Sequence, residues 1–256
     1  MTTILHSKLP EEMQRSTALP GIAPCGSEDW LRVDEAYAAQ MARRISLIKT
    51  QRSAVLWMDK AAMPAVLELL DEVLQLLPNL GFTVDDDQVR CPDGRTVQVS
   101  QNDPLGTLAQ LVQEDLCIHE KRGDEHVLLA AVLCFPASWL LSEKVGRPLS
   151  AIHAPVAEYD TKLAARVQRM FDGVQIGRPL WRMNQLWYVD PELHQPRSVT
   201  SPRALADGPN GAGFYRSERQ CIVRLPKTRA VVFSIHTYVL DAKAVPDEVM
   251  LGKDAR

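Results

Sequence analysis

The chain has little that would tie it to a membrane, to secretion or to nucleic acid. Its longest apolar run, residues 127–135, is far shorter than the roughly 20 residues that cross a bilayer. The N-terminus lacks the basic region and apolar core of a signal peptide. A net charge of −3 offers no positive excess for nucleic acid or an anionic membrane. We therefore expect a cytoplasmic protein that binds neither membranes nor nucleic acid.

Cysteine is scarce and scattered. No two cysteines have the Cys-x-x-Cys spacing of a structural zinc site or the clustered spacing of an iron–sulfur centre. An odd number of separated thiols is typical of reduced cytosolic protein. The five residues are Cys25, Cys91, Cys117, Cys134 and Cys221. A Gly-x-Gly-x-x-Gly motif after a strand is also missing, so the chain shows no dinucleotide site of its own.

What remains is an ordinary globular composition, with 46% hydrophobic and 24% charged residues in 256. That length fits one large domain or one domain with a helical appendage. Apolar periodicity predicts a mostly helical region over residues 1–113, packed on the rest. Its expected elements are a helix after Asp34, a helix over 60–77, a hairpin of 82–84 with 96–99 around Pro92-Asp93-Gly94, and a short helix at Asp103-Pro104.

The period changes at residue 114. Two strands, a helix and then three strands predict an α+β fold, an antiparallel sheet with a helix across one face. The expected strands are 115–120, 126–135, 181–189, 215–225 and 230–240, and the helix spans 159–174. This core would end at residue 245, leaving a short tail at 246–256. The loop 200–213, rich in proline and glycine, is either a mobile lid or a plain surface loop.

Two stretches carry polar residues of chemical interest. His153 precedes the central helix on a segment stiffened by Pro148 and Pro155, where it is either a metal ligand or an ordinary loop residue. In the fourth strand, Arg216, Glu218 and Gln220 share one face, which is either a solvated surface or part of a pocket. Ser217, Arg219 and Cys221 share the more apolar face, so we expect Arg219 to be partly buried and to need a partner.

Seven motifs occur in order over roughly residues 100–240. They are Gln113-Glu-Asp-Leu-Cys117, Cys134-Phe-Pro-Ala-Ser-Trp139, Glu143-Lys-Val-Gly-Arg147, Ile152-His-Ala-Pro-Val156, Arg182-Met-Asn184, Arg216-Ser-Glu-Arg-Gln220 and Arg224-Leu-Pro226. Together they resemble the alpha-subunit-like family of haem-dependent oxidative N-demethylases. The resemblance implies a PAS-like core over residues 114–245 that holds haem b.

The resemblance also implies a reaction. The family's namesake removes a methyl group from a small amine such as dimethylamine, using dioxygen and releasing formaldehyde, with electrons from a separate reductase chain. On that basis His153 is the expected axial iron ligand, with Cys91 a weaker alternative. The expected partners of the haem propionates are Arg147, Arg182, Arg216 and Arg219, because a guanidinium fork matches a carboxylate. Glu218 is the expected anchor for the substrate ammonium.

Two departures from the family pattern keep other functions open. The chain has Val156-Ala157 where the family has Val-Pro, beside the expected ligand. It has Asn184-Gln-Leu-Trp187 where the family has tryptophan directly after asparagine. A non-catalytic sensor of the PAS type, or a scaffold that has lost haem, are the alternatives to a monooxygenase.

Overall fold

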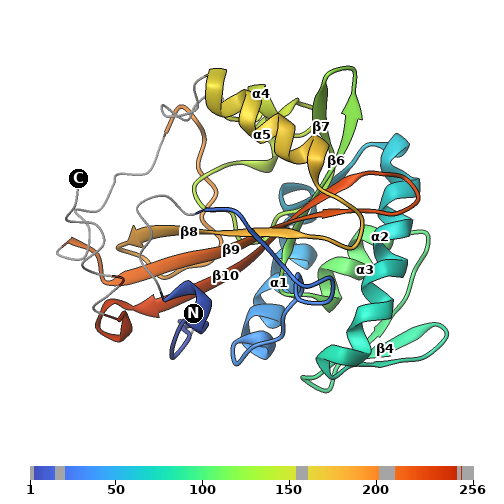
Figure 1. The fold of residues 1–256 in the computed structure, drawn as a ribbon. Helices are drawn as coiled ribbons and strands as arrows, with labels where there is room; N and C mark the ends of the chain where they lie inside the picture. The colour runs from blue at the N-terminus through green and yellow to red at the C-terminus, as the bar shows by residue number, and fades with distance from the viewer. Residues whose placement is uncertain (1–2, 15–20, 154–160, 202–210, 247–248, 250–256) are drawn as a thin grey trace.

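The fold is α+β, as the sequence predicts, with a large antiparallel sheet and several helices (Figure 1). The structure is a computed structural model that describes residues 3–14, 21–153, 161–201, 211–246 and 249. None of the helices within these ranges is long and apolar enough to cross a bilayer. The division of the chain at residues 113 and 245 stays a prediction.

The main sheet has seven strands in the order β1-β8-β9-β10-β6-β7-β2. Every neighbouring pair is antiparallel. The strands are β1 (Ala23–Pro24), β2 (Leu56–Met58), β6 (Asp115–Arg122), β7 (Glu125–Val132), β8 (Leu180–Tyr188), β9 (Phe214–Arg224) and β10 (Val231–Asp241). The five long strands lie within a few residues of the predicted ranges. The two short edge strands come from the N-terminal region, and the sequence pattern did not reveal them.

Successive side chains along a strand point to opposite faces, so the sheet has two distinct surfaces. We call the surface that carries Arg182, Glu218 and Phe233 the helix face, because α4 and α5 cover part of it (Figure 1). The opposite surface, which carries Arg219 and His236, is the N-terminal face. Residues 5–14 and 21–35 and α1–α3 pack against that side.

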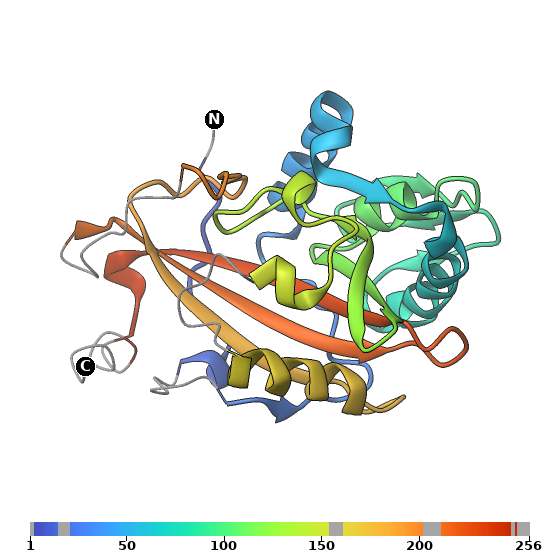
Figure 2. The same ribbon diagram turned by 90° about the horizontal axis from the view of Figure 1, so that it is seen from above.

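The central helix of the prediction is α5 (Thr161–Gly173), preceded by the short α4 (Leu149–His153). Figure 2 shows α5 running beside the long strands. Phe171 and Val174 pack on Ile222 of β9 and Val231 of β10. The Arg224 guanidinium donates hydrogen bonds to the carbonyls of Phe171, Asp172 and Val174. A cation there satisfies carbonyls that the end of a helix leaves free, which explains the arginine of the Arg-Leu-Pro motif.

The remaining helices build the largest apolar core against the N-terminal face. They are α1 (Tyr37–Val55), α2 (Met63–Leu76) and α3 (Pro104–Leu111), with the short 3-10 helices η2 (Lys60–Ala62) and η3 (Leu77–Leu80). The other 3-10 helices, η1 (Glu11–Met13), η4 (Leu141–Glu143) and η5 (Ala242–Ala244), contribute to smaller apolar clusters. The predicted helix over 60–77 is thus divided into η2, α2 and part of η3. Asp59 caps its start, and Gly81, at a φ of 86°, ends it.

The predicted hairpin of 82–84 with 96–99 is wrong in its pairing. β4 (Gln88–Arg90) lies between β3 (Thr83–Val84) and β5 (Thr96–Gln98) and pairs with both. The Pro92-Asp93-Gly94 turn therefore joins β4 to β5. Its Gly94 has a φ of 83°, which favours glycine. The residues of β4 include two polar side chains at its ends, which hid a three-residue strand from the apolar pattern.

A buried ion pair joins the N-terminal region to the sheet. Arg44 of α1 is 0% exposed, and its Nη1 lies 2.6 Å from Oδ1 of Asp115 at the start of β6. Arg44 also donates to the carbonyls of Ala109, Gln113 and Glu114. Asp115 in turn accepts the backbone N–H groups of Cys134 and Phe135. The Gln-Glu-Asp-Leu-Cys motif is therefore structural, because buried charges persist only when they are paired and hydrogen-bonded.

Candidate functional site

The helix face carries a cluster of polar side chains on the neighbouring strands β8 and β9. Register pairs Arg182 with Gln220 and Asn184 with Glu218, so these four side chains neighbour one another across β8 and β9. Arg216 lies two residues before Glu218 on the same face. The sequence left open whether this surface is solvated or enclosed. Arg216 is 2% and Glu218 is 4% exposed, so at these two positions it is enclosed.

Arg216 and Glu218 form a buried pair. Nη2 of Arg216 lies 3.1 Å from Oε1 of Glu218, and Nε donates to the same oxygen. Oε2 of Glu218 accepts from the Gln220 amide at 3.0 Å. Arg216 also donates hydrogen bonds to the carbonyls of Phe135 and Leu193. Arg216 therefore holds Glu218 and two loops in place, and both oxygens of Glu218 already accept hydrogen bonds.

Arg182 contrasts with Arg216. Its Nε is buried and has no hydrogen-bond partner within the described part of the chain. Burial lowers the pKa of Arg182 from its ordinary value, and the charge of Glu218 only partly opposes this. A buried guanidinium donor without an acceptor destabilises the fold, because no hydrogen bond offsets the free energy of its desolvation. The side chain is thus suited to an anionic ligand that supplies the missing acceptor.

The charges of the cluster point the same way. Two guanidiniums, of Arg182 and Arg216, face one carboxylate, Glu218, and the amides of Asn184 and Gln220 are neutral. The local balance is one positive charge, and around the buried Arg216 and Glu218 electrostatic attraction is stronger than in water. This surface therefore favours a ligand that carries a carboxylate or phosphate group.

The other expected ligand residues lie in three different places. His153 is the last residue of α4, and its side chain lies outside the described residues. Arg147 is exposed on the turn before α4. Arg219 points to the N-terminal face, where its guanidinium pairs with Asp29 at 2.9 Å. The prediction that Arg219 needs a partner is confirmed, but the sheet separates it from Arg182, Arg216 and Glu218.

Two other histidines and Cys91, the weaker alternative to His153, are also separated by the fold. His119 lies on the helix face, where its ring packs edge-on against Phe171 of α5 at 5.3 Å. His236 points to the N-terminal face and contacts two carboxylates. Cys91 is buried in the β4–β5 region, and burial raises the pKa of its thiol. The loop 200–213 lies largely outside the described residues, so the lid interpretation stays a prediction.

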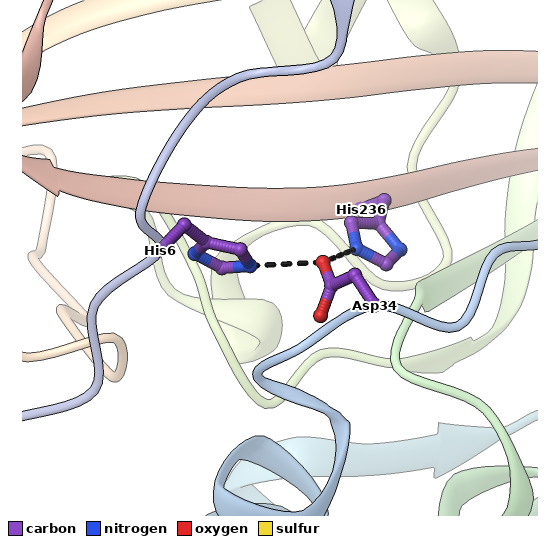
Figure 3. Close-up of side chains that lie close together, drawn as sticks. All are labelled: His6, Asp34 and His236. Carbon is purple, nitrogen blue, oxygen red and sulfur yellow. Dashed lines mark hydrogen bonds and ion pairs between the residues drawn. The ribbon is translucent and has the colours of Figure 1, made fainter.

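A second titratable cluster, which sequence reasoning did not find, lies on the N-terminal face (Figure 3). Oδ2 of Asp34 lies 2.8 Å from Nε2 of both His6 and His236. Nδ1 of His236 lies 2.8 Å from Oε1 of the buried Glu114. The sequence offers no signal for this cluster, because its histidines are 230 positions apart along the chain and no spacing rule links them.

Two histidines and a carboxylate are ligand types that metals prefer, and their ligand atoms lie within 4.8 Å of one another. The hydrogen bonds of the cluster indicate that its ring nitrogens carry hydrogens rather than a metal ion. Nδ1 of His6 accepts the backbone N–H of Val239, so the ring hydrogen is on Nε2, which faces Asp34. Metal binding at that nitrogen would displace this hydrogen. We therefore interpret the cluster as a proton-holding clamp between the N-terminal segment and β10.

The charge state of the clamp follows from its partners. His236 is fully buried, which by itself lowers its pKa, but Glu114 and Asp34 outweigh burial and raise the pKa to about 9. The hydrogen bonds from His236 and His6 hold the pKa of Asp34 well below its usual range, against the effect of burial. His6 and Asp34 line a cavity of about 760 Å³ on the N-terminal face, so solvent reaches the cluster.

Comparison with known families agrees with the motif pattern. Residues 21–255 match the family described as haem-dependent oxidative N-demethylase, alpha subunit-like. The match includes the polar cluster on the helix face, Asp34 and His236, and the ion pairs of Arg44, Arg216 and Arg219 described above. Because it spans well over half of the sequence, the chain belongs to the haem-dependent oxidative N-demethylase alpha subunit-like family.

Proposed function

We propose that this chain binds haem b against the helix face of a PAS-like core and uses it for oxidative demethylation of a small methylated amine. The family's haem dependence supports the cofactor. The observation that carries the proposal in the structure is Arg182, whose buried Nε has no acceptor among the described residues. A haem propionate is a carboxylate and would supply that acceptor in bidentate geometry.

The residues divide into those that would hold the cofactor and those that would position the amine. Arg182 would pair with a propionate, and Arg147, on the exposed turn before α4, is a second candidate. His153 would be the axial ligand. When bound, haem supplies the oxidising chemistry with dioxygen. The protein excludes water from the reaction and fixes the orientation of the amine.

Glu218 is the carboxylate at the centre of the polar cluster and remains our candidate for the substrate ammonium. Arg216 fixes the orientation of the Glu218 carboxylate by donating to Oε1, and the Gln220 amide donates to Oε2. A carboxylate offers about four lone-pair directions, so an ammonium would share these oxygens rather than replace a partner. Fixed orientation of this kind is what amine positioning requires.

A haem titration of the purified chain tests the cofactor proposal. The wild type should develop a Soret band with one haem per chain. Arg182→Gln should weaken haem affinity roughly tenfold to 150-fold, the equivalent of losing a hydrogen bond between charged groups worth about 1.5–3 kcal/mol. Arg90→Gln is the matched control, since Arg90 is exposed on β4, away from the helix face. Equal affinities of all three proteins would remove Arg182 from the site.

His153→Ala tests the axial ligand in the same titration. The Soret band should be lost or should shift, because the iron loses its protein ligand, while the far-UV circular dichroism stays unchanged. His119→Ala is the comparison, since His119 is the alternative histidine on the helix face. An unchanged spectrum for His153→Ala and a shifted one for His119→Ala would reassign the ligand.

The proposed reaction needs electrons from a donor other than this chain. Oxidation with dioxygen at a haem consumes two electrons per turnover, and the sequence shows neither a dinucleotide motif nor clustered cysteines. The family description as an alpha subunit implies a multi-subunit oxidase. We therefore propose a separate reductase chain as the partner.

A further inference from the structure

Two of the five cysteines share one arginine on the N-terminal face. Nη1 of Arg219 lies 3.0 Å from Sγ of Cys221, and Nη2 lies 3.3 Å from Sγ of Cys25. Nη2 also contacts Oδ2 of Asp29 at 2.9 Å. The two thiols come from β9 and from the residue after β1, which are 196 positions apart in the chain. One rigid guanidinium fork thus brings the two sulfurs side by side.

The two thiols differ in exposure and in acidity. Cys25 is half-buried, whereas Cys221 is buried. The hydrogen bond from Cys221 and the charge of Arg219 lower the pKa of Cys25 to about 7, against burial and Asp29. The hydrogen bond to Cys25 and, after it, burial raise the pKa of Cys221. An accessible thiolate beside a second thiol is the arrangement found in redox-sensitive cysteine pairs.

The other three cysteines provide a contrast within the same chain. Cys91, Cys117 and Cys134 are buried, and burial raises the pKa of each thiol. Within the described residues, no arginine guanidinium forms a hydrogen bond with the sulfur of any of these three cysteines. At neutral pH these thiols stay protonated and shielded, so they should react slowly with oxidants and alkylating agents.

We propose that Cys25 and Cys221 form a redox-active pair that hydrogen peroxide converts into a disulfide, with Cys25 as the attacking and Cys221 as the resolving thiol. The pair lies on the N-terminal face, across the sheet from Arg182 and Glu218. It therefore does not depend on the function proposed for the helix face. Arg219, which that function does not use, stabilises both sulfurs as they lose their protons.

The chemistry balances in two steps. The Cys25 thiolate attacks one oxygen of hydrogen peroxide, the O–O bond breaks, and hydroxide leaves and takes up a proton, which gives a sulfenic acid and water. The Cys221 sulfur then attacks the Cys25 sulfur, the S–S bond forms and the S–O bond breaks. The departing hydroxide takes up the proton of the Cys221 thiol and leaves as a second water. Two thiols lose two electrons in total, and one peroxide gains two.

Peptide mapping of the full-length protein tests the pair. With iodoacetamide near pH 7, Cys25 should be the first thiol modified, at least about tenfold faster than Cys91, Cys117 or Cys134, because about half of it is thiolate. One equivalent of hydrogen peroxide, followed by alkylation, should yield a peptide cross-linked between Cys25 and Cys221. Dithiothreitol should reverse the link.

Variants separate the two roles. Cys221→Ser should leave Cys25 as a sulfenic acid that dimedone traps, and Cys25→Ser should abolish the cross-link while Cys221 stays reduced. If Cys221→Ser does not fold, the wild-type peptide map decides alone. Failure to find the cross-link, with Cys25 and Cys221 both still free, would overturn the proposal. Oxidation spread equally over all five cysteines would do the same.

Discussion

The clamp on the N-terminal face gives the protein a pH-dependent stability that can be calculated from one histidine. Glu114 and Asp34 raise the pKa of His236 from 6.5 to about 9. Each pKa unit corresponds to about 1.36 kcal/mol, so the protonated ring stabilises the folded state by about 3 kcal/mol. Because the folded pKa lies above the unfolded one, this contribution is complete below about pH 6.5 and is lost as the pH rises to about 9.

The assay is urea unfolding of wild type and His236→Gln at about pH 6 and about pH 9.5. The variant removes the charge and leaves Glu114 and Asp34 facing each other without a cation. It should be less stable than wild type at the lower pH, and the difference should shrink by about 3 kcal/mol at the higher pH. The lowered pKa of Cys25 makes a contribution to stability that increases with pH. That contribution cancels in the difference between the two proteins, because both contain Cys25.

His126→Gln is the matched control. His126 is buried on the helix face beside Gln168, and burial lowers the pKa of its ring. A lowered pKa destabilises the folded wild type only as the pH falls below about 6.5. The difference between wild type and His126→Gln should therefore change little between about pH 6 and about pH 9.5, and in the opposite direction to that of His236→Gln. A difference between wild type and His236→Gln that is independent of pH would refute the clamp.

Three further predictions concern the buried ion pairs and the helix end. Asp115→Asn leaves Arg44 charged and buried without a carboxylate, and should cost about 3–5 kcal/mol in urea unfolding. Arg224→Leu frees the carbonyls at the end of α5 and should cost about 1–3 kcal/mol, with faster amide exchange in that helix than in the sheet. Glu218→Gln should weaken dimethylamine binding by about 1.5–3 kcal/mol in a haem spectral titration, and an unchanged affinity would restrict Glu218 to its pair with Arg216.

The long elements of the fold could be predicted from the sequence because each carries its own periodic pattern. The strands β6, β8, β9 and β10 and the helices α1 and α2 all follow from alternation or from apolar stripes. The short strands β1, β2 and β4 could not be predicted, because two or three residues hold no period. Their pairing is decided by tertiary contacts with longer neighbours.

The site could be predicted only in part. Strand parity correctly placed Arg219 on the face opposite Glu218, and that same parity argues against grouping Arg219 with Arg182 as partners of one ligand. The clamp could not be predicted, because His6 and Asp34 are far from His236 in the sequence and meet it only in the folded protein, beside β10. The sequence could not show that Arg216, rather than solvent, neutralises Glu218, since that depends on the loops of Phe135 and Leu193 closing over the strand.

Formaldehyde release from dimethylamine tests the central claim most directly. The haem-loaded chain in the presence of dioxygen and NADPH should produce no formaldehyde above background, because it shows no electron route of its own. Addition of a competent reductase should give continuous release with multiple turnovers per haem, and Glu218→Gln should raise the KM for the amine. Haem-loaded protein that accepts electrons from the reductase and still releases no formaldehyde would contradict the account and would favour a sensor function.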